Sequence, residues 1–264
     1  GVGELVAEQP TADDIAVEDL DVDGDLDVVV FGETMMRVFT YDSFAAAFTA
    51  GEEYTVDWIG SPEVELVDVD NNSTLDIVAI QPAGLQVFRG DGFAGFAAPQ
   101  TVAPLDPVLA SFAVADFSGD AYPDIAITTA DGGGWQLLTG DPANPDIYSA
   151  GPVRALPGGS QRLIAANFDG GSMDLFSETN GRIGVFPVWL DAGAGDPADL
   201  THWVSGRSLS DGEPAIIDIN GDGMIDVVQL TNEEARISYR DSTAGFYCPR
   251  ARVGAEVLGP VDSY

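Results

Sequence analysis

The sequence predicts an all-β fold built from five consecutive repeats. An acidic loop recurs along the chain, and its first positions fall at residues 19, 68, 116, 167 and 218. The steps between these positions are 49, 48, 51 and 51 residues, and each loop is followed by an apolar run. No stretch shows a sustained apolar period of about 3.6 residues with helix caps. A regular period without a helical pattern indicates a repeat architecture made of strands.

The loop at residues 218–226 shows the repeated motif most completely. It reads DINGDGMID, so that oxygen-bearing side chains fall at positions 1, 3, 5 and 9. Glycine stands at positions 4 and 6, where a tight loop often needs a positive φ. Several hard oxygen ligands around one point are what Ca²⁺ requires. An EF-hand is a poorer explanation, because its position 12 is a glutamate, where this chain has Gln229.

The other loops vary this motif. They read DLDVDGDLD at residues 19–27, DVDNNSTLD at 68–76, DFSGDAYPD at 116–124 and NFDGGSMD at 167–174. The loop at 167–174 is one residue short, so its closure around an ion is left open. Carboxylates crowded within about 5 Å repel one another strongly at low dielectric, so a bound cation is the economical explanation. The alternative is that these loops are solvated turns.

Each loop is expected to join two short strands. After them we expect a third strand, a turn and a fourth segment that contains an aromatic residue. The aromatic residues are Phe48, Phe96, Tyr148, Trp203 and Phe246. About 50 residues per repeat accommodate four strands with their turns. Four-stranded sheets packed radially form a β-propeller. We therefore expect one five-bladed domain over residues 1–264. The repeats are 12–59, 60–109, 110–159, 160–210 and 211–264, with 1–11 closing the ring; residues 246–252 could instead supply that outer strand.

Composition narrows the partners. The formal net charge is −34, all ten basic residues are arginine, and the chain has no lysine. Nucleic acid and anionic membranes are therefore poor partners, because the field of the protein repels phosphate. The single cysteine, Cys248, cannot form an intrachain disulfide. The sequence contains no run of 18 apolar residues, so it predicts no membrane-spanning helix. Calcium loops of modest affinity suit extracellular calcium, so we expect a secreted or surface-exposed protein.

The loops together with Gly90-Asp91-Gly92-Phe93 resemble the FG-GAP/VCBS repeat of integrin α-subunit heads. They also resemble a fungal lectin built as a seven-bladed propeller. The resemblance runs from about residue 12 to 250 and implies Ca²⁺ at four loops, with a fifth, degenerate site. The implied side-chain ligands are Asp19, Asp21, Asp23 and Asp27; Asp68, Asp70, Asn72 and Asp76; Asp116, Ser118, Asp120 and Asp124; Asp218, Asn220, Asp222 and Asp226; and, in the degenerate site, Asn167, Asp169 and Asp174.

Position 7 of the resembling loop supplies a backbone carbonyl, here from Asp25, Thr74, Tyr122 and Met224. The chain departs from the family at two points besides the short loop. Familiar members have seven blades rather than five, and Ser73 and Ala121 replace the glycine at position 6.

The leading functional prediction is a non-catalytic calcium-binding recognition or adhesion module for carbohydrate or protein. The alternatives are a structural surface-protein repeat without a ligand and a carbohydrate-active lyase or hydrolase. The chain has one histidine, no lysine and no Gly-x-Ser-x-Gly motif. Most combinations of a catalytic nucleophile and a base are therefore absent, which disfavours an enzyme. Candidate contact residues are Trp58, Trp135, Trp189, Trp203 and His202, for which packing between blades is the favoured interpretation. The ligand and the oligomeric state are not indicated.

Overall fold

The computed structural model describes residues 12–57, 63–104, 109–129, 134–154, 162–166, 173–179, 182–187, 202–204, 215–223, 225–230, 235–241 and 245–247. Every regular element in these ranges is a β-strand. The described ranges hold no helix long and apolar enough to cross a bilayer. The strands form five four-stranded sheets, each following the order of the chain. The predicted all-β architecture of antiparallel four-stranded sheets is therefore confirmed.

The first three sheets are nearly continuous in the described ranges. The first contains β1 (Ala12–Glu18), β2 (Asp27–Gly32), β3 (Met35–Asp42) and β4 (Ala47–Thr55). The second contains β5 (Val64–Val67), β6 (Asp76–Gln81), β7 (Gly84–Phe88) and β8 (Gln100–Pro104). The third contains β9 (Leu109–Ala115), β10 (Asp124–Thr129), β11 (Trp135–Gly140) and β12 (Tyr148–Ala150).

The last two sheets repeat the same plan with shorter strands. The fourth contains β13 (Arg162–Ala166), β14 (Asp174–Thr179), β15 (Arg182–Pro187) and β16 (His202–Val204). The fifth contains β17 (Ala215–Ile217), β18 (Asp226–Leu230), β19 (Ala235–Asp241) and β20 (Gly245–Tyr247). All neighbouring strands within the five sheets pair antiparallel.

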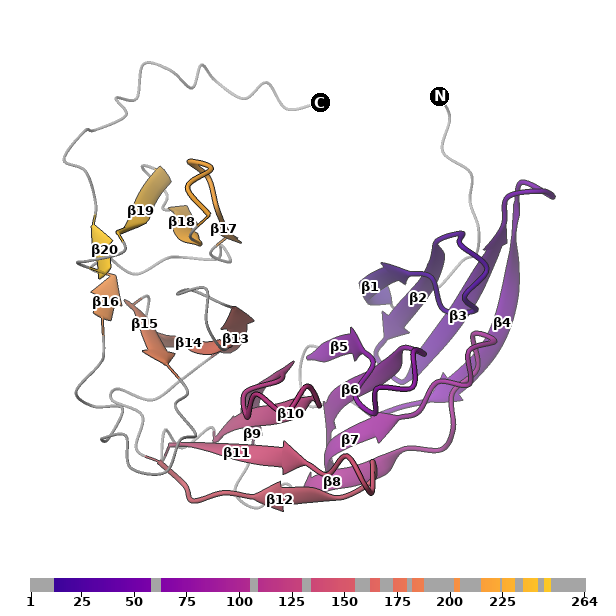
Figure 1. Ribbon diagram of the computed structural model, residues 1–264. Coiled ribbons are helices and arrows are strands. Elements are labelled where there is room, and N and C mark those ends of the chain that lie inside the picture. Colours follow the sequence, from indigo (N-terminus) through magenta and orange to yellow (C-terminus); the bar gives the residue numbers. More distant parts are fainter. Residues whose placement is uncertain are drawn as a thin grey trace.

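Successive sheets follow one another along an arc (Figure 1), and apolar cores join the first four. Val29, Phe31 and Met36 of the first sheet share one apolar core with Ile77 and Phe88 of the second. A second core joins the second and third sheets, and a third core joins the third and fourth. All six residues of β6 are buried, as expected for a strand covered on both faces. In the first three sheets the acidic loop joins the first two strands, and its second residue, Leu20, Val69 or Phe117, is buried in one of these cores, which holds the loop in place.

The aromatic residue expected after each turn does not take the same place in every sheet. Phe48 and Tyr148 lie in the fourth strands of their sheets, whereas Phe96 precedes β8 and forms an isolated bridge with Gly90. The Asp91 carboxylate accepts the amides of Phe93 and Gly95, which widens this turn. Phe96 then lies edge-on to Tyr54, with 6.0 Å between ring centroids. It fills the space between the first two sheets before the strand begins.

Glu65 in β5 makes the stability of the protein depend on pH. Burial raises the pKa of its carboxyl from 4.5 to about 7, a backbone hydrogen bond from Val114 opposes this shift, and the Glu63 charge adds to it. The folded state then binds more protons than the unfolded chain between these values, so the free energy of unfolding falls as the pH rises through this window. We expect Glu65→Gln to be more stable than the parent by about 3 kcal/mol at pH 8 and equally stable at pH 4.

Urea unfolding at the two pH values measures this difference. Glu18→Gln is the matched control, because it removes one negative charge from an exposed position in β1. A gain at pH 8 as large in Glu18→Gln as in Glu65→Gln would assign the effect to net charge instead of burial.

Candidate metal centre

The acidic loops of the first, second, third and fifth sheets share one backbone conformation. Positions 4 and 6 have positive φ in each of them. The values are 62° and 93° at Val22 and Gly24, 59° and 70° at Asn71 and Ser73, 77° and 67° at Gly119 and Ala121, and 76° and 84° at Gly221 and Gly223. Val22 holds this conformation although β-branched residues strongly disfavour it. The loop fold is therefore imposed by its hydrogen bonds and not by glycine alone.

The carboxylate at position 1 organises these four loops. Asp19 accepts the amide of Asp23 through Oδ1 at 3.2 Å and the amide of Gly24 through Oδ2 at 3.1 Å. Asp218 accepts the corresponding amides of Asp222 and Gly223 at 3.2 and 2.8 Å. Asp68 and Asp116 make the same two bonds in their own loops. These bonds curl the backbone so that alternate side chains face inward.

The aspartate at position 9 is fixed more firmly. Asp27, Asp76, Asp124 and Asp226 are each 0% exposed. Asp124 accepts the amides of Phe117, Ser118 and Gly140 at 3.0, 2.8 and 3.0 Å. Asp27 likewise accepts the amide of Leu20 in the loop and that of Tyr41 in β3. In the first and third sheets this aspartate therefore ties the loop to the third strand of its own sheet, in addition to the role as a ligand that the sequence predicts.

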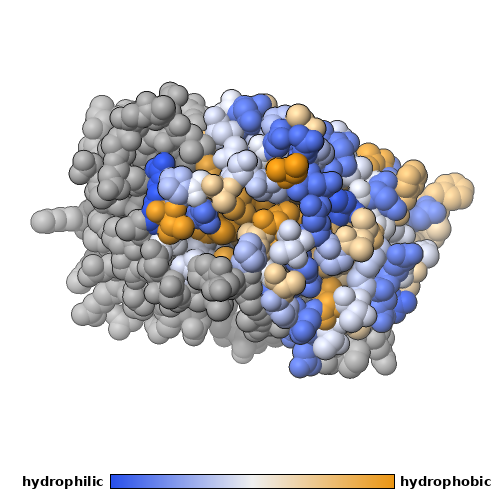
Figure 2. All heavy atoms as spheres, turned by 90° about the horizontal axis from the view of Figure 1, so that it is seen from below, coloured by the Kyte–Doolittle hydropathy of each residue, from blue (hydrophilic) through white to orange (hydrophobic). Residues whose placement is uncertain are grey.

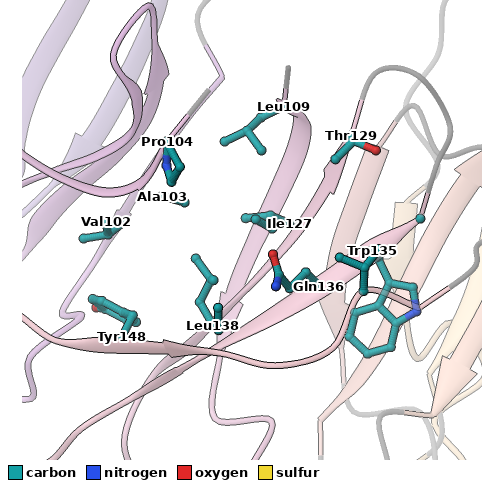
Figure 3. A pocket seen from close by; sticks show the side chains of 13 residues that line it. Val102, Ala103, Pro104, Leu109, Ile127, Thr129, Trp135, Gln136, Leu138 and Tyr148 are labelled. Atoms are coloured by element: carbon teal, nitrogen blue, oxygen red, sulfur yellow. The ribbon is translucent and has the colours of Figure 1, made fainter. Parts of the chain in front are cut away.

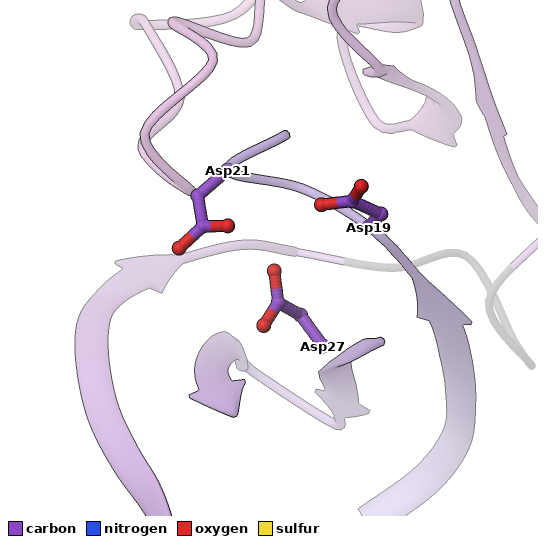
Figure 4. Close-up of side chains that lie close together, drawn as sticks. All are labelled: Asp19, Asp21 and Asp27. Carbon is purple, nitrogen blue, oxygen red and sulfur yellow. The ribbon is translucent and has the colours of Figure 1, made fainter. Parts of the chain in front are cut away.

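Three carboxylates converge in each of the first two loops. Single oxygens of Asp19, Asp21 and Asp27 lie within 4.8 Å of one another, as Figure 4 illustrates, and the Asp68, Asp70 and Asp76 carboxylates are arranged in the same way. Desolvation is the main cause that raises the pKa of Asp21, and the charges of Asp27 and Asp23 raise it further. A cation between these oxygens would relieve this repulsion. Their donor set of hard, anionic oxygens fits Ca²⁺.

The third and fifth loops each carry three carboxylates at positions 1, 5 and 9, as many as the second loop and one fewer than the first. Ser118 and Asn220 stand at position 3, so a neutral oxygen replaces a carboxylate there. Asn220 donates to Asp222 at 2.9 Å and accepts its amide at the same distance. In the fifth loop, backbone hydrogen bonds, the strongest from Gly223, lower the pKa of Asp218. These two loops keep the oxygen ligands and need less charge compensation than the first loop.

Other predicted ligands have different partners. The Asp25 carboxylate accepts the amide of Ser43 at 2.7 Å, in the turn after β3. Asp23 accepts the amide of Asp25, Asp120 accepts that of Tyr122, and Asn72 accepts that of Thr74. Five predicted residues lie outside the described residues: Asn167, Asp169, Met224, Trp58 and Trp189. For Asp174, His202 and Trp203 the structure describes the backbone but not the side chain. These predictions stay predictions.

Trp135 lies in the core, as the packing interpretation expects. It is 2% exposed, and the Arg154 guanidinium lies 5.5 Å from its ring centroid. Trp135 also lines an apolar cavity of about 250 Å³ between the second and third sheets, together with Val102, Leu109, Ile127 and Leu138 (Figure 3). On the face shown in Figure 2, apolar side chains gather between hydrophilic ones. The sequence could not indicate this cavity, because its walls come from strands of two sheets.

The sequence interpretation missed one charged residue at the second loop. The Arg89 Nη1 atom lies 3.0 Å from Asp76 Oδ2 and 3.6 Å from Asp70 Oδ2. Both aspartates are predicted ligands. The sequence did hold a sign of this role. Arg89 stands immediately after an apolar strand, at a position where the first and third repeats have Thr40 and Thr139.

Comparisons with known proteins agree with the loop pattern. The family model of the FG-GAP-like repeat matches residues 68–127, from the first position of the second loop into β10. No curated protein matches the sequence. Among solved structures, an Agrocybe aegerita lectin described for specific recognition of non-reducing terminal N-acetylglucosamine is similar, with a TM-score of 0.66 and 20% identity. The alignment covers 91% of this chain and 65% of the lectin, so the chain spans less than two thirds of the lectin's length.

Two further structures are similar at lower scores. A putative 6-phosphogluconolactonase from Bacteroides uniformis has a TM-score of 0.53 and 14% identity over 84% of this chain and 67% of its own. Saccharomyces cerevisiae Sqt1 has a TM-score of 0.53 and 15% identity over 84% of this chain and 57% of its own. At these identities the likeness concerns the fold, which is propeller-like. The predicted resemblance is thus confirmed by a family match, and the chain carries an FG-GAP-like repeat at residues 68–127.

Proposed function

We propose that the chain is a non-catalytic, calcium-binding β-propeller module of five blades that recognises carbohydrate or protein outside the cell. The convergence of three carboxylates in each of the first two loops is the observation that carries this proposal. The same loop conformation recurs in four of the sheets, so a cation would stabilise a repeated structural element. The ligands would be the oxygens at positions 1, 3, 5 and 9 and the carbonyl at position 7.

Structural calcium leaves the surface of the module free for recognition. The match to the FG-GAP-like repeat and the likeness to a lectin support a binding role over a catalytic one. The lectin favours carbohydrate as the first ligand class to test. Secretion or surface exposure follows from the same proposal, because loops of modest affinity fill at extracellular calcium concentrations.

A glycan array tests the recognition role. The labelled protein is applied in millimolar calcium and in EDTA, on glycans that include terminal N-acetylglucosamine. We expect binding in calcium and its loss in EDTA. The double variant Asp19→Asn with Asp21→Asn should weaken binding, whereas Asp13→Asn with Asp14→Asn, an equal charge change at exposed positions of β1, should not. Binding that is unchanged by EDTA would contradict a calcium-dependent module, and binding to no glycan would leave protein as the ligand class.

A further inference from the structure

Arg89 places a positive charge inside the second acidic loop. It follows β7, and its side chain is 17% exposed. Its Nη1 atom donates to Asp76 Oδ2 at 3.0 Å and lies 3.6 Å from Asp70 Oδ2. These carboxylates belong to the cluster that converges with Asp68. The guanidinium therefore already offsets part of the charge that calcium would neutralise.

The same guanidinium joins two sheets. Its Nη2 atom donates to the carbonyl oxygen of Pro145 at 2.6 Å and lies 3.6 Å from the Asp146 carboxylate. Gln100, at the start of β8, donates to the carbonyl of Asp146 at 3.0 Å. Arg89 is thus the link between the second loop and the turn that precedes β12 in the third sheet.

The first loop has no such cation among the residues that the structure describes. Phe88 pairs with Ile77 as Phe39 pairs with Val28, so Thr40 occupies the register of Arg89 in the first sheet. Thr139 occupies it in the third sheet, since Leu138 pairs with Ile125. The ion pairs between described residues include none to Asp19, Asp21 or Asp27. The first two loops share the carboxylate cluster at positions 1, 3 and 9. They differ in this cation and at positions 5 and 7, where Asn72 and Thr74 replace Asp23 and Asp25, so the Arg89 variants isolate the effect of the cation.

We propose that Arg89 is a built-in counter-ion of the second loop, and that calcium binds this loop more weakly than the first because it must displace the guanidinium. Two like charges cannot share the oxygens of Asp70 and Asp76 without strong repulsion. Calcium uptake at the second loop therefore separates Arg89 from Asp76 and loosens the link to Pro145. The inference rests on the proposed calcium binding and adds an order of filling, in which the first loop fills before the second.

A calcium titration of the ¹⁵N-labelled full chain, followed by NMR, tests this order. The amides of Gly24 and Ser73 are matched reporters, because each stands at position 6 and donates to the first aspartate of its loop. In the parent protein we expect the midpoint of Ser73 at a calcium concentration at least about tenfold above that of Gly24. Arg89→Thr should lower the Ser73 midpoint about tenfold or more and leave the Gly24 midpoint unchanged.

Arg37→Thr is the control, since Arg37 pairs with Glu53 on the first sheet and should change neither midpoint. Arg89→Gln removes the charge but keeps a donor for Pro145, so it serves if Arg89→Thr does not fold. Equal midpoints in the parent protein, or a Ser73 midpoint that neither Arg89 variant lowers, would overturn the proposal. A response of neither amide to millimolar calcium would instead contradict the proposed calcium binding itself.

Discussion

Removing calcium is expected to lower the melting temperature by on the order of 10 °C. At roughly 1 mM calcium and a dissociation constant of about 0.1 mM, each filled loop adds about 1.4 kcal/mol to the free energy of unfolding. The loops that share this conformation together add about 4 to 6 kcal/mol, and 1 kcal/mol corresponds to roughly 2–4 °C for a chain of this size. Thermal unfolding in calcium and in EDTA, at low ionic strength, measures the difference.

Variants separate specific binding from general screening of the charge of −34. Asp19→Asn with Asp21→Asn should lose part of the calcium-dependent gain, because both carboxylates belong to the cluster of the first loop. Asp13→Asn with Asp14→Asn should keep the whole gain. A melting temperature that is the same in EDTA and in calcium would count against structural calcium, and an equal gain from a monovalent salt of matched ionic strength would assign the effect to screening.

Asp124→Ala is expected to destabilise the protein by about 3–5 kcal/mol even in EDTA. The Asp124 carboxylate is fully buried and accepts three backbone amides, from Phe117, Ser118 and Gly140. Truncation leaves these donors without their acceptor, at a cost of about 1–3 kcal/mol for each one that water cannot reach. Burial raises the pKa of Asp124, so part of this cost is offset by removing a desolvated charge.

Asp120→Ala is the matched control in the same loop. Its exposed carboxylate accepts the amide of Tyr122. We expect Asp120→Ala to cost about 1 kcal/mol or less in EDTA, as for a single exposed hydrogen bond. Chemical denaturation of both variants measures the two costs. Equal losses would show that position 9 contributes nothing beyond an ordinary loop aspartate.

Much of the fold could be predicted from the sequence, because the acidic loop marks the same point of every repeat. The spacing of the loops and the apolar runs after them predict strands that the structure contains, such as β2, β6 and β10. The glycines at positions 4 and 6 predict positive φ, and Val22 shares this conformation although its residue type does not suggest it. Local pattern determines these features, so they can be read without tertiary contacts.

The remaining features depend on contacts between segments far apart in the sequence. The amides of Tyr41 and Gly140 reach the aspartates at position 9 only because β3 and β11 return beside their loops. Arg89 meets Asp76 because β6 and β7 pair within one sheet, and it meets Pro145 because the second and third sheets pack together. No repeat-level pattern encodes these contacts. The sequence therefore indicates the ligands of the loops but not the role of position 9 in folding or the charge of the second loop.

Anomalous diffraction from crystals grown in millimolar calcium tests the central claim most directly. The account predicts an anomalous peak between the carboxylates of Asp19, Asp21 and Asp27, with oxygen ligands at the roughly 2.3–2.6 Å typical of calcium. A further peak is expected in the acidic loops of the second, third and fifth sheets, with the lowest occupancy beside Arg89. Well-ordered loops without any anomalous peak at that calcium concentration would contradict the account.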